Sequence, residues 1–174
     1  MSFSWEPFGP SRWAEQPPAP AGRDTAGAAR AGVREVADGA ATAPARLAAV
    51  PDAAPALARD PAQSLVVLTC MDARVDPLAA LRLRLGDAHV LRNAGAHVTD
   101  DVLRSLRLSQ RRAGTRRVIL LGHTDCVANG SDEATVAALR RGMTALQRTG
   151  ALAPGSALQA LLYDVATGSV NPVE

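Results

Sequence analysis

Several residue types are scarce or missing in this chain of 174 residues. Lysine is absent, so all 19 basic residues are arginines, and aromatic residues make up only 3% of the sequence. The core must therefore be built mainly of Leu, Val and Ala. Neither sign of charge dominates, because 17 acidic residues are interspersed among the basic ones and leave a formal net charge of +2. This near balance argues against a nucleic acid as a partner.

Long hydrophobic runs are also missing. No apolar stretch is long enough to span a membrane, and the first residues, M-S-F-S-W-E-P-F-G-P, lack the basic and apolar regions of a secretory signal. We therefore expect a cytoplasmic location without a membrane partner. The sequence has only two cysteines. In a reducing cytoplasm they are expected to serve metal binding or catalysis rather than a structural disulfide.

The composition changes along the chain. Residues 1–30 are rich in Pro, Ala and Gly and show no period, which predicts an extended or disordered N-terminal arm. Residues 31–174 are predicted to form one domain. Its Ala-rich beginning, up to Arg59, favours one or two short helices that prolines interrupt.

Segments typical of strands and helices alternate from Ser64 onward. The apolar run S-L-V-V-L-T, up to Cys70, is typical of a strand buried on both faces. Further strands are predicted over 89–92, 117–122 and 158–165, with a short antiparallel edge over 170–173. Helices are predicted over 77–85, from an N-cap at Thr99 to about 114, and from an N-cap at Ser131 to about 148.

The second of these helices is expected to turn four apolar side chains toward the core: Val102, Leu103, Leu106 and Leu108. The alternation as a whole predicts an α/β fold, with a central, mostly parallel β-sheet of about four to five strands flanked by helices.

Polar side chains follow three of the predicted strands. Cys70 follows the first strand, Asn93 the second and His123 the third. Functional groups of such folds gather where parallel strands end. We therefore expect these residues to converge at one edge of the sheet.

The motifs C-M-D-A-R at 70–74 and H-T-D-C at 123–126 carry the candidate chemistry. His123 and Cys126 are three residues apart and can share a metal ion in a turn, with Cys70 arriving from the neighbouring strand. Two thiolates and one imidazole suit zinc in a tetrahedral shell. Three protein ligands leave one position open, which is typical of a catalytic zinc site.

Asp72 and Arg74 fit a role beside this metal. Two thiolates cancel the charge of zinc and make it a weaker acid than it would be among three histidines. A nearby carboxylate can accept a hydrogen bond from the zinc-bound hydroxide and fix its orientation. Asp72 is two residues from Cys70, and Arg74 offers a planar fork that can hold Asp72 away from the metal. The same two residues would also suit a structural ion pair.

Together these motifs resemble the β-class carbonic anhydrases, whose signature is C-x-D-x-R followed by H-x-x-C. The segments R-N-A-G at 92–95, V-T-D-D-V-L-R-S-L at 98–106 and Y-D-V-A-T-G at 163–168 extend the likeness. The resemblance implies reversible hydration of CO2 to bicarbonate and a proton by zinc-bound hydroxide.

The resemblance also implies residue roles. One zinc per chain would be held by Cys70, His123 and Cys126, and Asp72 would orient the hydroxide, or ligate zinc in a closed resting form, while Arg74 restrains it. Asn93, Ala94 and Gly95 would line the substrate pocket. The implied assembly is a homodimer or a higher homo-oligomer.

Two other functions stay open. Relatives in this superfamily hydrolyse carbonyl sulfide or carbon disulfide with the same zinc core, and a non-catalytic zinc protein is a third reading. Val127 follows the second Cys where the family usually has Gly, so the turn at the metal is expected to be shaped differently. Asp125 is expected to be a turn or cap residue, and His89 and His97 to have structural or surface roles.

Overall fold

The structure of the protein is a computed structural model that describes residues 58–174. The arm predicted for residues 1–30 and the short helices expected before residue 58 lie outside the described residues, so the division of the chain stays a prediction. Among the described helices, none combines the length and the apolar character that crossing a membrane requires.

A five-stranded sheet with the order β2-β1-β3-β4-β5 forms the centre of the fold. Its first four strands run parallel and β5 pairs antiparallel with β4, which confirms the predicted α/β class. The strands are β1 (Leu65–Cys70), β2 (Ala88–Asn93), β3 (Arg117–His123), β4 (Ala157–Tyr163) and β5 (Val170–Val173).

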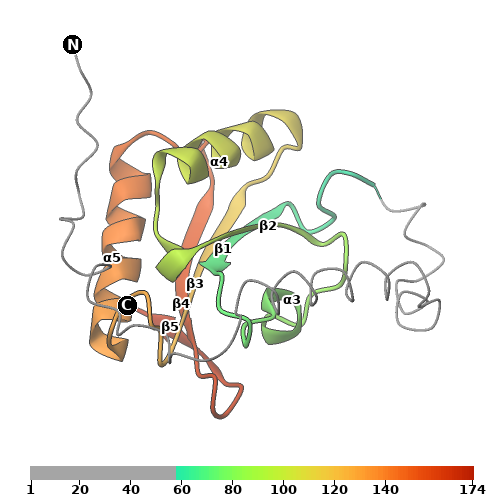
Figure 1. Cartoon of the computed structure of the whole chain (residues 1–174). Coiled ribbons are helices and arrows are strands. Elements are labelled where there is room, and N and C mark those ends of the chain that lie inside the picture. The colour runs from blue at the N-terminus through green and yellow to red at the C-terminus, as the bar shows by residue number, and fades with distance from the viewer. Residues whose placement is uncertain (1–57) are drawn as a thin grey trace, which may run out of the picture. The chain divides into compact units, whose positions relative to one another are not determined.

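Successive residues of the central strands point to opposite faces of the sheet. Val66 and Leu68 of β1 belong to the core under α4 (Asp100–Arg112) and α5 (Asp132–Arg148), on one side of the strands in Figure 1. Leu65 and Val67 belong to a second, smaller core on the other face, against which Ala80 of α3 (Pro77–Ala80) packs. Burial on both faces explains why β1 begins with four consecutive apolar residues.

Both predicted N-caps of the long helices are confirmed. The side-chain oxygen of Thr99 accepts a hydrogen bond from the Val102 amide at 3.4 Å, and that of Ser131 accepts one from the Ala134 amide at 3.1 Å. Each cap satisfies an amide that the first helical turn would otherwise leave unpaired. The caps therefore fix where both helices begin.

Two expectations about helices are wrong. The helix expected over 77–85 ends at Ala80, because Arg82 adopts a left-handed backbone conformation with a φ of 53°. Leu108 does not face the core, since its exposed fraction is 51%. It lies roughly 200° around the helix axis from Leu106, which is 1% exposed.

The contrast between these two leucines of α4 gives a test of the core. Leu106→Ala should lower the free energy of unfolding by about 2–5 kcal/mol, because it leaves a cavity between helix and sheet. Leu108→Ala is the matched control and should change it by less than about 0.5 kcal/mol. Urea unfolding of the full chain measures both, and equal losses would contradict the described orientation of α4.

Candidate metal centre

Three side chains able to bind a metal ion meet at the carboxyl edge of the sheet. Cys70 ends β1, His123 ends the adjacent β3, and Cys126 lies in the turn that follows. One ligand atom from each lies within 4.8 Å of the others, and all three residues are buried. The convergence predicted for Cys70, Asn93 and His123 at this edge is therefore confirmed, and Cys126 joins them there.

The spacing of the two sulfur atoms fits a tetrahedral zinc ion. Cys70 Sγ and Cys126 Sγ are 3.9 Å apart, and both cysteines are free. Two thiolates bound at about 2.3 Å to a tetrahedral zinc lie roughly 3.8 Å apart. The sulfurs can therefore accept zinc with little movement.

His123 offers the third donor. Its Nδ1 lies 2.8 Å from the Thr124 carbonyl oxygen. A carbonyl only accepts, so Nδ1 carries the hydrogen and Nε2 keeps its lone pair. Nε2 is buried, and among residues 58–174 it is the buried side-chain nitrogen or oxygen atom that has no hydrogen-bond partner. A buried acceptor without a partner costs free energy. A metal ion bound to Nε2 would remove that cost.

Backbone amides approach the sulfur atoms. The Gly95 N–H donates to Cys70 Sγ at 3.3 Å. Burial raises the pKa of the Cys126 thiol, while the nearby backbone amides of Asn129 and Ala128 act in the opposite direction. For Cys126 the amides therefore offset part of the cost that burial places on the thiolate form, which zinc requires.

Asp72 and Arg74 form the pair that the motif predicts. Arg74 Nε donates to Asp72 Oδ1 at 3.0 Å and Nη2 donates to Oδ2 at 2.8 Å. These bonds, with one from the Arg74 backbone amide, hold the pKa of Asp72 well below its usual range. Asp72 Oδ2 lies 3.9 Å from His123 Nε2. An ionised carboxylate therefore lies beside the candidate metal position while turned toward Arg74.

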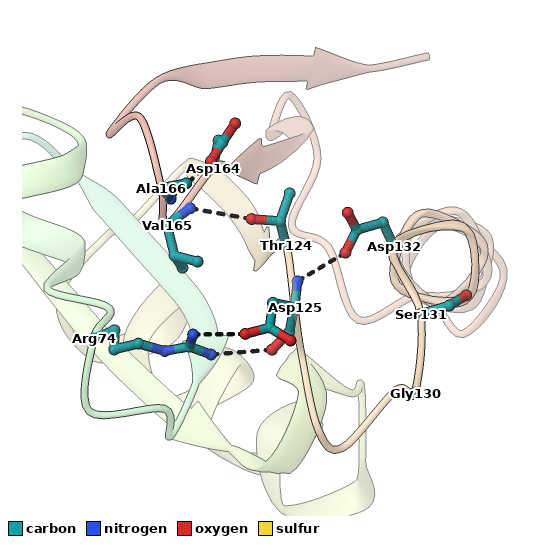
Figure 2. A pocket seen from close by; sticks show the side chains of 9 residues that line it. All are labelled: Arg74, Thr124, Asp125, Gly130, Ser131, Asp132, Asp164, Val165 and Ala166. Carbon is teal, nitrogen blue, oxygen red and sulfur yellow. Dashed lines mark hydrogen bonds and ion pairs between the residues drawn. The ribbon is translucent and has the colours of Figure 1, made fainter.

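A second carboxylate holds the other side of Arg74. Nη1 donates to Asp125 Oδ2 at 2.7 Å, and Nη2 donates to the Asp125 carbonyl oxygen at 3.0 Å, as Figure 2 shows. Asp125 itself has a φ of 53°, and its amide donates to Asp132 Oδ1 at 2.7 Å. Asp125 is thus the expected turn residue, but it also anchors Arg74, which no sequence pattern indicates.

An open hollow of about 680 Å³ lies beside the Arg74–Asp125 ion pair. Arg74, Thr124 and Asp125 form one wall, the start of α5 a second and the turn at 164–166 a third (Figure 2). None of the three candidate ligands lines it. The hollow therefore gives solvent access to the Arg74 side of the centre.

Arg92 and Asn93 shape the loops around the ligands. Arg92 Nε donates to the Cys70 carbonyl at 3.0 Å, and Nη2 donates to the Asp72 carbonyl at 2.7 Å. Both polar atoms of the Asn93 side chain bind the backbone of His97, at 2.7 and 2.9 Å. Contact of Asn93, Ala94 and Gly95 with a substrate stays a prediction. The bracing role of Arg92 was missed, although the R-N-A-G motif contains it.

The turn after Cys126 accommodates Val127. Its side chain is 90% exposed and it is not among the residues with a positive φ. The left-handed positions of this turn are Asp125 and Gly130 instead. A residue with a Cβ is therefore compatible with the turn at this position.

The two other histidines both pair with a polar side chain. His89 Nδ1 pairs with Ser109 Oγ at 2.7 Å, which fits the structural role expected for it. His97 Nε2 pairs with Asn129 Oδ1 at 2.9 Å, next to Gly95. Sequence reasoning missed Asn129, because a single Asn in a turn carries no signal for a contact with a loop 34 residues away.

Exchange of one ligand tests the metal centre. Cys126→Ser replaces a soft thiolate by a hydroxyl that zinc binds poorly, so the purified protein should lose nearly all its zinc. The matched control is Val127→Ser, an exposed neighbour that should leave the zinc content unchanged. Elemental analysis of zinc per chain measures both. Tight zinc in Cys126→Ser would remove Cys126 from the ligand set.

Comparison with known proteins agrees with this geometry. The family model for carbonic anhydrase matches residues 65–149. Beta-carbonic anhydrase 1 of Mycobacterium tuberculosis is 56% identical over 66 residues, which are 38% of this chain and 40% of the relative. Carbon disulfide hydrolase of Saccharolobus solfataricus is 52% identical over 62 residues, 36% of this chain and 30% of the relative. The chain thus matches well under half the length of these curated relatives.

A solved structure covers more of the fold. The crystal structure of carbonic anhydrase from Streptococcus mutans superposes with a TM-score of 0.71 and 30% sequence identity, and the match covers 80% of this chain and 98% of the other. With its mostly parallel sheet, its Cys-His-Cys cluster and these matches, the chain belongs to the β-carbonic anhydrase family.

Proposed function

We propose that the protein is a zinc enzyme that interconverts CO2 and bicarbonate, that is, a carbonic anhydrase. The observation that carries this proposal is the position of Asp72. Its Oδ2 lies 3.9 Å from the unpartnered His123 Nε2, beside the Cys70–His123–Cys126 cluster, and Arg74 restrains it there. A site that only stabilised the fold would not need a restrained carboxylate next to its open position.

Zinc, when bound, would supply the Lewis acidity that makes a water molecule nucleophilic near neutral pH. The protein's part is to orient that water toward the carbon of CO2. Asp72 is suited to this because its low pKa keeps it ionised, so Oδ2 can accept a hydrogen bond from the water. The proton released is expected to leave with solvent buffer.

Arg74 would keep Asp72 available for this work. A free carboxylate so near a cation would bind it and occupy the open position. The two bonds from Arg74 to Asp72 oppose that movement, and Asp125 opposes a shift of Arg74 toward the metal position. We therefore expect Asp72 to act as a hydrogen-bond acceptor more than as a ligand.

The proposal also covers the zinc stoichiometry, the assembly, the location and the partners of the enzyme. We propose one zinc per chain, a homodimer or higher homo-oligomer, a cytoplasmic location, and neither a nucleic-acid nor a membrane partner. The assembly is supported by the tetrameric β-carbonic anhydrases of Sordaria macrospora, which share the fold at a TM-score of 0.66.

Hydrolysis of carbon disulfide or carbonyl sulfide is the second candidate. It is favoured by the carbon disulfide hydrolase from Saccharolobus solfataricus, which is 52% identical over 62 residues. Both chemistries need a nucleophilic water and an acceptor such as Asp72. Their substrates differ mainly in size and polarity, so activity assays must separate them.

Replacing Asp72 tests the mechanism. Asp72→Asn keeps the shape of the side chain but turns one oxygen into a donor, so kcat for CO2 hydration should fall by about a hundredfold or more. Zinc should stay near one per chain. Stopped-flow CO2 hydration measures the rate. The control is Asp101→Asn in the exposed ion pair with Arg104, which should leave the rate unchanged.

Each outcome of this experiment has a clear meaning. Full activity in Asp72→Asn would remove Asp72 from the mechanism. A wild-type protein that carries zinc but hydrates no CO2 would contradict the first candidate. Sulfide release from carbon disulfide or carbonyl sulfide would then establish the second candidate, and its absence would leave a metal that only stabilises the fold.

A further inference from the structure

Asn129 lies in the turn that follows the last candidate ligand. The backbone amides of Asn129 and Gly130 donate to the Cys126 carbonyl at 3.1 and 2.9 Å, so the turn is closed on the ligand-bearing residue. The side chain of Asn129 is half-buried and points out of this turn toward the loop that follows β2. It therefore connects two segments that are distant in the sequence.

Both the oxygen and the nitrogen of the Asn129 side-chain amide make hydrogen bonds. Its Oδ1 lies 2.9 Å from His97 Nε2. Its Nδ2 donates to the Gly95 carbonyl at 3.3 Å and to Thr135 Oγ1 at 3.2 Å. The orientation of the amide is fixed, because a flipped side chain would place its oxygen against the Gly95 carbonyl. His97 Nε2 must then carry the hydrogen.

This contact reaches the first sulfur through Gly95. The Gly95 N–H donates to Cys70 Sγ at 3.3 Å, while its carbonyl accepts from Asn129. Gly95 has a φ of 78°, and a Cβ on it would lie 2.7 Å from Asn129 Oδ1 and from the His97 ring. The peptide units around Gly95 are thus held between Asn129 and Cys70.

We propose that Asn129 is a positioning residue that couples the two cysteine-bearing parts of the metal centre. It ties the Cys126 turn to the Gly95 loop and thereby keeps the Gly95 N–H on Cys70 Sγ. Such a bond fixes the position of Cys70 Sγ and the direction of its lone pairs, so its loss should make the site bind a metal ion less tightly. The proposal rests on the proposed zinc site but not on the reaction that the site performs.

Zinc affinity of the full-length protein tests the proposal. Asn129→Ala removes all three side-chain bonds and should weaken zinc binding about tenfold or more, measured by competition with a chromogenic chelator. Asn171→Ala in β5 is the matched control, because Asn171 is exposed and makes its side-chain bond to Ser169, away from the centre. It should keep the wild-type affinity.

The wild-type protein separates failure of this proposal from failure of the proposed function. If the wild-type protein binds no zinc, the proposed site is wrong and the positioning role falls with it. If the wild-type protein binds zinc tightly and Asn129→Ala binds it within about twofold as well, the proposal is overturned while the zinc site stands.

A spectroscopic measurement distinguishes positioning from a general loss of stability. In the cobalt-substituted protein, loss of the N–H donor on Cys70 should raise the energy of the sulfur lone pairs. The sulfur-to-cobalt charge-transfer band of Asn129→Ala should therefore move to lower energy, while the Asn171→Ala band should not move. A weakened affinity with an unmoved band would overturn the route through Gly95 and Cys70.

A pair of variants at His97 tests the bridge without altering Asn129. His97→Ala removes the donor to Asn129 Oδ1 and should weaken zinc binding severalfold. His97→Gln places an amide N–H at a similar reach and should restore most of the affinity. Equal zinc affinity in the two variants would overturn the part assigned to the His97–Asn129 bond.

Discussion

The parallel pairing of β1 with β3 is the constraint on which the candidate metal centre depends. It brings the ends of the two strands to one edge, so Cys70 and His123 meet although they are more than fifty residues apart. The pairing is secured by side chains buried on both faces, in two separate cores. The precision of the site is therefore a consequence of the sheet, and the loops have only to supply Cys126 and the residues that brace the ligands.

Arg74 is the charged group that holds Asp72 beside the candidate metal position. Its guanidinium lies between Asp72 and Asp125, and both carboxylates accept short bonds from it. For Asp72 to reach a metal ion, two charge-assisted hydrogen bonds must break at once. Asp125 is largely exposed, with 76% of its side chain accessible, so its contribution to stability is small. Its effect is geometric, because it fixes the direction from which Arg74 holds Asp72.

The sequence predicted those features of the fold and the site that depend on local patterns. Strand β1 was visible as an apolar run, and the caps at Thr99 and Ser131 as polar residues before helical segments. The ligand cluster followed from strand ends plus two short motifs. Leu108 and the end of α3 were predicted wrongly, because a list of leucines does not give the angle around a helix and Arg82 gives no sign of its left-handed conformation.

The bracing residues escaped prediction for a different physical reason. Arg92, Asp125 and Asn129 act through bonds to backbone atoms or to side chains of distant loops. Such bonds depend on where folded loops lie and not on residue spacing. The role proposed for Asn129 is of this kind, since the Gly95 N–H donates to Cys70 Sγ from the loop that Asn129 binds. A motif thus specifies which atoms are available to bind a metal ion, whereas the surrounding loops specify how rigidly those atoms are presented, and the affinity of a metal site depends on both.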